Sequence, residues 1–415
     1  MKPSKQYLDG FSLLCYKLGR QEMKTVEDAI SFIHGRPKGG RKESMARMYA
    51  LLESLGNPQN QLPPAIHVTG TNGKGSVATM TSNILRVAGY KTGLFVSPYI
   101  ISFCERIQVN NELISEVNLL TTTKAVAEVL KYVDKQLAPD IPTEFEVLTA
   151  IMFTYFAQQK LDAVVIEVGI GGQLDSTNVM PNTKVAVITS VGLDHQSLLG
   201  NSIVEIARQK AGIIHDDMAV VVGDLPEEAR QVIANRAGGT LIQGQLNVFE
   251  QGLPGTYQIQ NTATAVAAVK AFDMNIKAVD IQQGLNDSHI AARFELIRPS
   301  VMIDGAHNAQ GLKKLYESLN RPEYQTKTMT LIIGSLMDKN VVLAFDEILK
   351  NKRFTIVLVP FTGPNGRHSL DIEAVAKKYG VQVADNWREA YHQSEADMTI
   401  FTGSLYFVSE VREEI

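Results

Sequence analysis

The sequence predicts an α/β protein in which a doubly wound, mainly parallel sheet is followed by a smaller domain of the same class. Two runs, Asp162–Val168 and Lys184–Ser190, are almost continuously apolar, as expected for parallel strands covered by helices on both faces. Segments with helical spacing alternate with such runs, which is typical of a parallel sheet. A second alternation begins near residue 290, so we expect domains over residues 1–289 and 290–415.

The elements of the first domain follow in a regular order. Helices are predicted where apolar residues recur at helical spacing, in the segments Ser44–Leu55, Val77–Val87, Ser115–Leu137, Thr143–Gln158, Ser202–Ala211, Pro226–Arg236 and Gln258–Phe272. Strands are predicted where short apolar runs stop at turn residues, at Ala65–Val68, Thr92–Val96, Asp162–Val168, Lys184–Ser190 and Ala219–Gly223.

The second domain is predicted to be Rossmann-like. Asn286–Ser288 is expected to link the two domains. Strands are predicted at Val301–Asp304, Thr328–Ile333, Phe354–Val359, Val381–Ala384 and Met398–Thr402, with helices between them. This order of strands and helices fits a second, smaller doubly wound sheet.

Composition excludes several classes of protein. Of the 415 residues, 45% are hydrophobic and 20% are charged, as in soluble globular proteins. The net charge of −4 implies no broad basic surface, so nucleic acid is not an expected partner. Apolar runs are too short to span a bilayer or to form a signal peptide. The two cysteines, Cys15 and Cys104, lack metal-like spacing, and we interpret them as free thiols in a reducing cytoplasm. We also expect the protein to be a monomer.

The stretch from Val68 to Ser76 reads VTGTNGKGS and lies between a predicted strand and a predicted helix. Glycines there allow backbone N–H groups to approach an anion, and the helix start adds partial positive charge. Lys74 supplies a mobile positive charge, and the Ser76 hydroxyl can ligate Mg²⁺. The spacing departs from the standard phosphate loop, so an ordinary glycine-rich turn is the alternative. Because the strand, the lysine and the serine occur together, the sequence favours nucleotide binding.

Two further polar residues are predicted at the carboxyl ends of strands, where parallel sheets bind ligands. Glu167 closes an apolar run, where a carboxylate needs charged partners such as Mg²⁺. The alternative for Glu167 is an ion pair at a strand end. His195 follows the next strand, and alone it would be interpreted as a surface or capped residue. Together, the two residues indicate a metal site.

Ten motifs in one order resemble those of the folylpolyglutamate synthase and dihydrofolate synthase family, which is itself similar to the muramyl ligases, and the resemblance extends over most of the chain after Met23. The motifs are LGNPQ (Leu55–Gln59), HVTGTNGKGS (His67–Ser76), SPYIISFCERI (Ser97–Ile107), TEFE (Thr143–Glu146), IEVGIGG followed by DSTNV (Ile166–Val179), LDHQSLLG (Leu193–Gly200), KAGII (Lys210–Ile214), DGAHN (Asp304–Asn308), GSLMDKN (Gly334–Asn340) and TGSLY (Thr402–Tyr406). Residues 1–22 precede the resemblance, and we interpret them either as an extension or as lying before the biological start at Met23.

The resemblance implies an ATP- and Mg²⁺-dependent ligase that joins L-glutamate to a folate or to dihydropteroate through an acyl phosphate. It implies two magnesium sites, with Ser76, Glu167, His195 and a carbamylated Lys210 as ligands. Lys74, His195 and Lys210 are the implied catalytic residues. The implied ATP contacts are Gly70, Thr71, Asn72, Gly73, Lys74, Gly75, Ser76, Asn261, Arg293, Asp304 and His307. The implied contacts to the folate and glutamate substrates are Ser97, Pro98, Phe103, Arg106, His307 and Ser404.

Each implied role has a plainer alternative. Asn261 and Ser404 could only cap their helices, and Asp304 could be part of a strand-ending turn. Phe103 and Arg106 could belong to an ordinary hairpin entry. Lys210, without the resemblance, would be interpreted as a solvated charge on a helix.

Three positions depart from the pattern of the family. Tyr257 stands before the alanine-rich helix where the family often has histidine, Asn340 stands where aspartate is common, and Cys104 where asparagine is frequent. These departures concern recognition of adenine and pterin and leave the phosphate and metal groups intact. The competing functions are a muramyl-type amino-acid ligase and an ATP-binding regulatory module without ligase activity.

Overall fold

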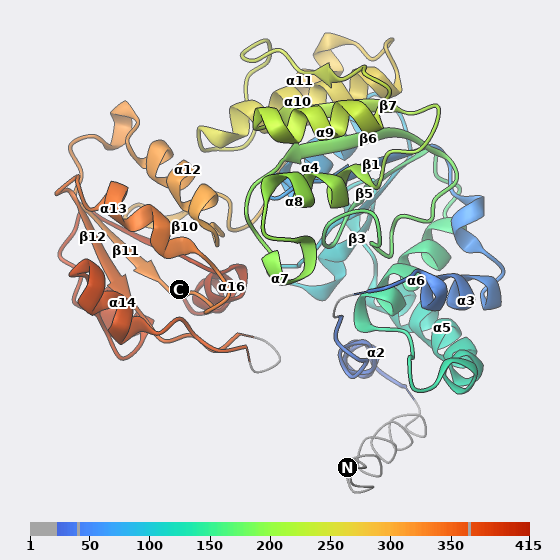
Figure 1. Ribbon diagram of the computed structural model, residues 1–415, viewed down its shortest axis with the longest axis horizontal. Coiled ribbons are helices and arrows are strands. Elements are labelled where there is room, and N and C mark those ends of the chain that lie inside the picture. Colours follow the sequence, from blue (N-terminus) through green and yellow to red (C-terminus); the bar gives the residue numbers. More distant parts are fainter. Residues whose placement is uncertain (1–22, 40–41, 364–366) are drawn as a thin grey trace, which may run out of the picture.

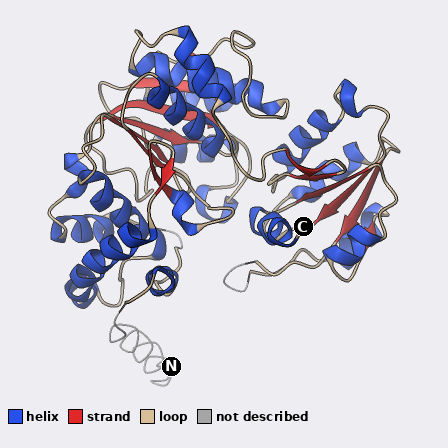
Figure 2. Cartoon of the chain, turned by 180° about the vertical axis from the view of Figure 1, so that it is seen from behind, coloured by secondary structure: helices blue, strands red, loops and turns tan. Residues whose placement is uncertain are grey.

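A computed structural model describes residues 23–39, 42–363 and 367–415 of the chain. The described chain forms two lobes, each built on its own sheet (Figure 1). Helices lie on both faces of the larger sheet, and the smaller lobe, which contains the C-terminus, repeats this layered arrangement (Figure 2). The predicted fold class is confirmed.

The larger sheet has eight strands in the order β4-β3-β2-β5-β1-β6-β7-β8. The strands are β1 (Ala65–Thr69), β2 (Thr92–Phe95), β3 (Ile107–Val109), β4 (Glu112–Leu113), β5 (Ala163–Glu167), β6 (Thr183–Ser190), β7 (Ala219–Asp224) and β8 (Ile242–Gln243). At one edge β2 pairs antiparallel with β3 and β3 pairs antiparallel with β4, and the other pairings are parallel. Parallel pairing brings the carboxyl ends of the central strands to one edge of the sheet, where ligands bind in such folds.

Side chains of the central strands alternate between two hydrophobic cores, as the period of two in a strand requires. Val185 and Val187 of β6 face one core, and Ala186 and Ile188 face another. The helices around this sheet are α2 (Val26–His34), α3 (Ala46–Ser54), α4 (Lys74–Val87), α5 (Glu116–Leu137), α6 (Glu144–Ala157), α7 (Gln196–Leu199), α8 (Ile203–Ala211), α9 (Glu227–Arg236), α10 (Tyr257–Phe272) and α11 (Ala278–Asn286). Helices α4, α10 and α11 cover the first core, and α8 and α9 cover the second.

The smaller sheet has six strands in the order β13-β12-β11-β14-β10-β9. Its strands are β9 (Glu295–Arg298), β10 (Val301–Ile303), β11 (Met329–Ile333), β12 (Phe354–Leu358), β13 (Gln382–Val383) and β14 (Met398–Thr402). Only the β9–β10 pairing is antiparallel within the described residues. Its helices are α12 (Ala309–Leu319), α13 (Phe345–Ile348), α14 (Ile372–Tyr379), α15 (Trp387–His392) and α16 (Leu405–Glu414).

The predicted elements lie close to the observed ones, but several observed elements were not predicted. Strands β3, β4, β8 and β9 were missed because each has at most four residues, and helices α2, α7 and α11 were missed as well. Pro226 is the N-cap of α9 and not its first residue. Ser288, in the predicted linker, is buried, and its hydroxyl donates to the Gly284 carbonyl at 2.9 Å, so this segment packs on the larger lobe. The interpretation of residues 1–22 lies outside the described residues.

Candidate active site

The phosphate loop connects β1 to α4 and depends on two glycines. Gly73 caps α4 with φ of 85°, and a Cβ there would lie 2.4 Å from Asn261 Oδ1. A Cβ on Gly70 would lie 1.9 Å from Thr189 Oγ1. A side chain at either position would therefore push the loop away from its neighbours, and the predicted need for glycine has a steric cause.

The end of β6 holds this loop in place. The hydroxyls of Thr189 and Ser190 donate to the Asn72 carbonyl at 2.6 and 2.9 Å, and the Asn72 N–H donates back to Ser190 Oγ at 2.9 Å. The Thr71 N–H donates to the Ser190 carbonyl at 2.9 Å. With its backbone fixed from one side, the loop can present its remaining N–H groups to an anion.

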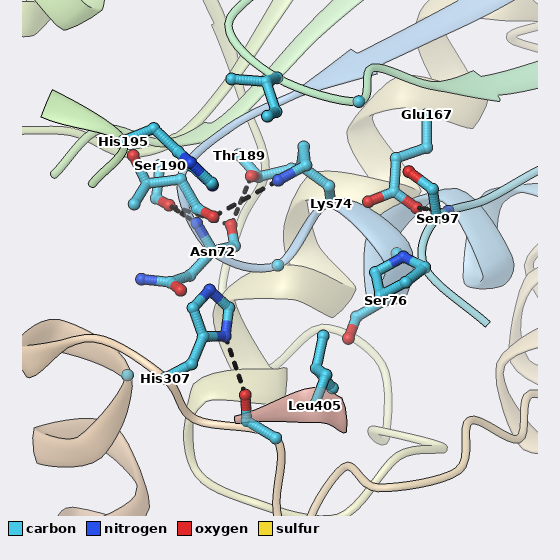
Figure 3. Close-up of a pocket in the computed structure, with 18 of the residues that line it drawn as sticks. Asn72, Lys74, Ser76, Ser97, Glu167, Thr189, Ser190, His195, His307 and Leu405 are labelled. Atoms are coloured by element: carbon cyan, nitrogen blue, oxygen red, sulfur yellow. Dashed lines mark hydrogen bonds between the residues drawn. The ribbon is translucent and has the colours of Figure 1, made fainter. Parts of the chain in front are cut away.

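Lys74 follows β1 and Glu167 ends β5, so both side chains lie at the carboxyl edge of the sheet, where the charge of Lys74 acts on Glu167. Lys74 Nζ donates to the Gly70 carbonyl at 3.1 Å, and its side chain is half-buried. Glu167 is 3% exposed, and its Oε2 accepts a hydrogen bond from the Ser97 N–H at 3.1 Å. Burial raises the pKa of Glu167, and the positive charge of Lys74 opposes that rise. In Figure 3 the Lys74 side chain lies between those of His195 and Glu167.

Burial favours the neutral forms of both His195 and Lys210. His195 precedes α7 with φ of 49°, and burial followed by the Lys339 charge lowers its pKa to about 4. Lys210 lies on α8 and is 2% exposed, and burial followed by the charge of Lys74 lowers its pKa well below the ordinary value. Lys210 is therefore no solvated charge, which was the plain alternative for it.

The second lobe contributes the residues that follow its strands β10 and β14. Asp304 comes directly after β10 and is buried, with hydrogen bonds from the Tyr257 hydroxyl at 2.7 Å and from the Phe294 and Ala306 N–H groups at 2.9 and 2.8 Å. Burial raises the pKa of Asp304, and the nearby charge of Arg293 opposes this. Asp304 is therefore more than part of a strand-ending turn, because its buried carboxyl group lies near the positive charge of Arg293.

Three other predicted residues lie around this point. His307 Nδ1 lies 3.0 Å from the Gly305 carbonyl oxygen. Asn261 lies inside α10 and donates to Gln258 Oε1 at 2.8 Å, so it does not cap its helix. Ser404 is the N-cap of α16, but its side chain makes no capping hydrogen bond.

A cavity of about 900 Å³ connects these groups from both lobes. The predicted site residues that line it are Thr71, Asn72, Gly73, Lys74, Gly75, Ser76, Ser97, Pro98, Arg106, Glu167, His195, Asn261, Arg293, Asp304, His307 and Ser404. Gly70 and Lys210 lie behind its wall. Phe103 also lies outside the lining, in the hydrophobic core of the larger lobe with its ring centroid 5.5 Å from that of Tyr99.

Arg106 is a buried cation that forms no ion pair with any residue the structure describes. It is 8% exposed, and its Nε is buried without a hydrogen-bond partner among the described residues. The guanidinium carbon lies 5.1 Å from the centre of the Tyr99 ring and 5.3 Å from that of Phe103. Because aromatic faces satisfy a cation only in part, Arg106 is suited to receive an anionic group in the cavity.

Several residues of the site were missed by sequence reasoning. Asp194 and Lys339 form a buried ion pair between the lobes, with 2.6 Å between Oδ1 and Nζ. Both stand in the motifs LDHQSLLG and GSLMDKN, so their placement could have been suspected. Thr189 and Ser190 end a predicted strand with two hydroxyls, which is the available signal for a loop-holding role. For Tyr257, the only indication in the sequence was that it stands where the family often has histidine.

Magnesium can be tested against the donors at hand. Within residues 23–39, 42–363 and 367–415, no group of three or more His, Cys, Asp or Glu residues that could hold a metal ion is present. Magnesium needs few such groups, because phosphates and waters supply most of its ligands. A Cβ on Gly75 would lie 3.5 Å from Glu167 Oε2, so this carboxylate reaches the first turn of α4 beside Ser76. A hydroxyl and a buried carboxylate at this place fit a magnesium ion.

Comparison with protein families matches two parts of the chain. Residues 68–238 match the Mur ligase middle domain, and residues 295–413 match the dihydrofolate synthetase C-terminal domain. None of the helices in the described part of the chain combines the length and apolar character that crossing a membrane requires. The second match separates this chain from muramyl ligases, because it covers the lobe that follows the shared middle domain.

Known proteins resemble the whole arrangement. A folylpolyglutamate synthase of Lacticaseibacillus casei is 36% identical over 94% of this chain and 98% of its own length. A dihydrofolate synthase/folylpolyglutamate synthase of Bacillus subtilis is 33% identical over 94% and 99%. A solved FPGS-AMPPCP-folate complex has a TM-score of 0.82 at 34% identity, over 94% of this chain and 99% of the other. A Mycobacterium tuberculosis folylpolyglutamate synthase complexed with ADP and AMPPCP has a TM-score of 0.81 at 29% identity, over 94% and 97%.

The loop, the buried carboxylate and the two-lobed cavity agree with these matches over nearly the full length of the relatives. A catalytic family, rather than a regulatory ATP-binding module, is therefore supported. The chain belongs to the folylpolyglutamate synthase/dihydrofolate synthase family of ATP-dependent glutamate ligases.

Proposed function

We propose that this chain adds L-glutamate to the carboxylate of a folate, with ATP consumed through an acyl phosphate. The observation that carries the proposal is the meeting of Lys74 and buried Glu167 in a cavity that both lobes line. Similar proteins have been solved with AMPPCP and folate. Dihydropteroate is the second candidate acceptor, because the Bacillus subtilis relative is named for both activities.

ATP is expected to place its phosphates on the loop from Gly70 to Ser76. The N-terminus of α4 points its first N–H groups at this position, and Lys74 adds a full positive charge. Asn261 and Arg293 line the same cavity on the side of α10, and Asp304 lies next to Arg293. These residues suit contacts to the base and the ribose of ATP.

Two magnesium sites are part of the proposal. Ser76 and Glu167 would hold one ion, and Glu167, His195 and a carbamylated Lys210 would hold the other. Bound magnesium would supply positive charge to the phosphate oxygens. Carbamylation requires a neutral amine, and burial of Lys210 lowers its pKa and so favours that form. His195 is likewise neutral, as a ligand must be.

The chemistry proceeds in two balanced steps. A carboxylate oxygen of the folate attacks the γ-phosphorus of ATP, the bond to the β-phosphate oxygen breaks, and ADP leaves. The amine of glutamate then attacks the acyl carbon, loses a proton, and expels inorganic phosphate from a tetrahedral intermediate. Lys74 stabilises the charge on the transferring phosphoryl group in the first step. The opposed lobes limit access of water to the acyl phosphate.

The folate and glutamate substrates are expected to bind on the other side of Glu167. Ser97, Pro98 and Arg106 line the cavity there, and the unpartnered guanidinium of Arg106 suits a carboxylate of folate or glutamate. Ser404 and His307 approach from the second lobe and suit the incoming amino acid. Phe103 supports this wall from behind, against Tyr99. A cytoplasmic location and a monomeric state remain predictions.

The test is incorporation of labelled L-glutamate into a small panel of pterin acids, with ADP release followed in parallel. The panel contains dihydropteroate, folate and reduced folates with one glutamate. We expect ADP release that requires both a pterin acid and glutamate, with a product one glutamate longer. ADP release that ignores either substrate would contradict the proposal, and a product from dihydropteroate alone would restrict it to dihydrofolate synthesis.

A further inference from the structure

The first turn of α10 carries Tyr257, whose role none of the chemistry above requires. The Tyr257 hydroxyl donates to Asp304 Oδ2 at 2.7 Å. This bond crosses between the lobes, because α10 packs on the larger sheet and Asp304 follows β10 of the smaller one. Tyr257 also stands where the family often has histidine. Since histidine can donate a hydrogen bond too, the substitution keeps a donor at this place.

Asp304 has little freedom left once this bond is made. Its Oδ2 accepts from Tyr257 and from the Phe294 N–H at 2.9 Å, and its Oδ1 accepts from the Ala306 N–H at 2.8 Å. Each carboxylate oxygen can accept about two hydrogen bonds. Oδ2 is therefore saturated, and Oδ1 keeps one free acceptor position. Asp304 lines the cavity, so a ligand hydroxyl can use that position.

The same helical turn is tied to the phosphate loop. Gln258, the next residue, donates from Nε2 to Ser76 Oγ at 3.2 Å, and Asn261 donates to Gln258 Oε1 at 2.8 Å. On the other side, the Thr256 N–H donates to Ser318 Oγ of α12 at 2.9 Å. Neighbouring residues of one turn thus contact the phosphate loop and the second lobe. The position of Asp304 is set relative to the loop that receives the phosphates.

In the hydrogen bond between Tyr257 and Asp304, the Tyr257 hydroxyl is the donor. Asp304 is buried and Tyr257 is half-buried, and burial, followed by the Asp304 charge, raises the pKa of Tyr257 well above its ordinary value. The phenol therefore stays protonated and acts as the donor. Without the phenol, the Asp304 carboxylate would keep its two backbone donors and could rotate to offer either oxygen.

We propose that Tyr257 is a positioning residue for the nucleotide, whose hydroxyl fixes Asp304 so that Oδ1 accepts a hydrogen bond from a ribose hydroxyl of ATP. This inference rests on the proposed function for the nucleotide site, but it concerns binding and not the ligation step. It assigns Tyr257 an effect through Asp304 and no contact with the reacting atoms.

The experiment measures binding of ATP, 2′-deoxy-ATP and 3′-deoxy-ATP by calorimetry, without folate or glutamate. We expect the wild type to prefer ATP over one of the two deoxynucleotides. In Tyr257→Phe, affinity for ATP should fall about tenfold, as for one lost hydrogen bond to a charged group, and this preference should disappear. Tyr257→His should restore the preference, because imidazole retains a donor.

A matched control is available in Tyr90→Phe. The Tyr90 hydroxyl donates to Asp273 Oδ2 at 2.7 Å, and neither residue lines the cavity. This variant should bind all three nucleotides as the wild type does. Thermal melting checks the fold of each protein, and Tyr257→Met supplies a second side chain without a donor if Tyr257→Phe does not fold.

Equal weakening of all three nucleotides by Tyr257→Phe would overturn the inference, since it would mean general damage to the site. Unchanged ATP binding, or a wild type without preference among the nucleotides, would overturn it as well. Failure of the proposed function has a different signature. In that case nucleotide binding follows the expected pattern, but labelled glutamate is not incorporated by the wild type.

Discussion

Lys339 Nζ lies 2.6 Å from Asp194 Oδ1, and this ion pair connects the two lobes where their sheets face the cavity. Both side chains are buried, at 8% and 7% exposure. Asn308 donates to Asp194 Oδ2 at 3.2 Å, and His307 Nε2 lies 3.5 Å from the same oxygen. Burial alone would raise the pKa of Asp194, but His307 and Lys339 hold it well below its usual range.

Lys339→Met is expected to loosen the contact between the lobes. It leaves the Asp194 carboxylate buried with only polar partners, which costs about 3–5 kcal/mol in comparable buried pairs. Ligase activity should fall at least tenfold, and small-angle X-ray scattering should show a larger radius of gyration. Lys313→Met is the matched control, because it removes a lysine from an exposed pair with Glu347 at 3.1 Å in the same lobe.

The double variant Asp194→Asn/Lys339→Met separates charge from contact. Removal of both charges should recover part of the compact shape, since no buried charge remains unpaired. If the single and double variants scatter alike and both resemble the wild type, the ion pair does not hold the lobes together.

Acid is expected to destabilise the larger lobe through His67. The His67 Nε2 lies 2.8 Å from Thr177 Oγ1, and burial, followed by the charge of His215, lowers its pKa to about 3. The unfolded chain binds a proton below about pH 6.5, whereas the folded chain does not, so stability is full above that pH and is lost as pH falls toward 3. At pH 5 the loss is about 2 kcal/mol.

The measurement is the urea midpoint of unfolding at pH 8 and at pH 5. In His67→Asn the difference between the two midpoints should be smaller than in the wild type, while His392→Asn, at an exposed position, should leave it unchanged. His195 has a similar shift, so part of the difference should persist. An identical difference in all three proteins would refute the role of His67.

Lys74→Ala should lower turnover by about 10²–10³-fold without unfolding the protein, because Lys74 is the mobile cation of the phosphate loop. Incorporation of labelled glutamate measures the loss, and thermal melting checks the fold. Lys124→Ala, on the exposed side of α5, is the control and should remain active. Glutamate ligation near the wild-type rate by Lys74→Ala would show that the lysine is not needed for phosphoryl transfer.

Lys210 should carry a carbamate when bicarbonate is present. Its burial lowers the pKa of the amine and favours the neutral form, which adds to CO₂ and loses a proton to give an anionic carbamate at Nζ. A protein equilibrated with ¹³C-bicarbonate should show a carbamate resonance that disappears in Lys210→Ala. A plain amine, both in intact mass and in crystallographic density with nucleotide and magnesium bound, would rule the modification out.

Much of the fold could be predicted because buried parallel strands have a simple signature. Lys184–Ser190 is apolar on both faces, and it ends at the residues that hold the phosphate loop. The short edge strand β4 has no such signature, because both its residues are exposed. Ser288 is polar and was interpreted as part of a linker, but its hydroxyl donates to the Gly284 carbonyl and accepts from Asn83, which allows it to be buried.

Some parts of the candidate site could also be predicted from the sequence, and others could not. The loop and Glu167 could be predicted, because chain neighbours determine them: a glycine-rich turn and the last residue of a strand. The pairing of Asp194 with Lys339 and of Tyr257 with Asp304 depends on how two lobes meet, and residues 145 and 47 positions apart leave no local pattern. Phe103 is the opposite case: its motif implied a contact to the substrate, but the side chain packs in the hydrophobic core.

The solitary guanidinium of Arg106 has a thermodynamic consequence. The Arg106 guanidinium is buried beside two aromatic rings, and this desolvation of a positive charge costs free energy. A carboxylate bound at this point would offset that cost, which adds to its affinity. A neutral amide of the same shape would lack that gain, so we expect Arg106 to favour an acid over the corresponding amide.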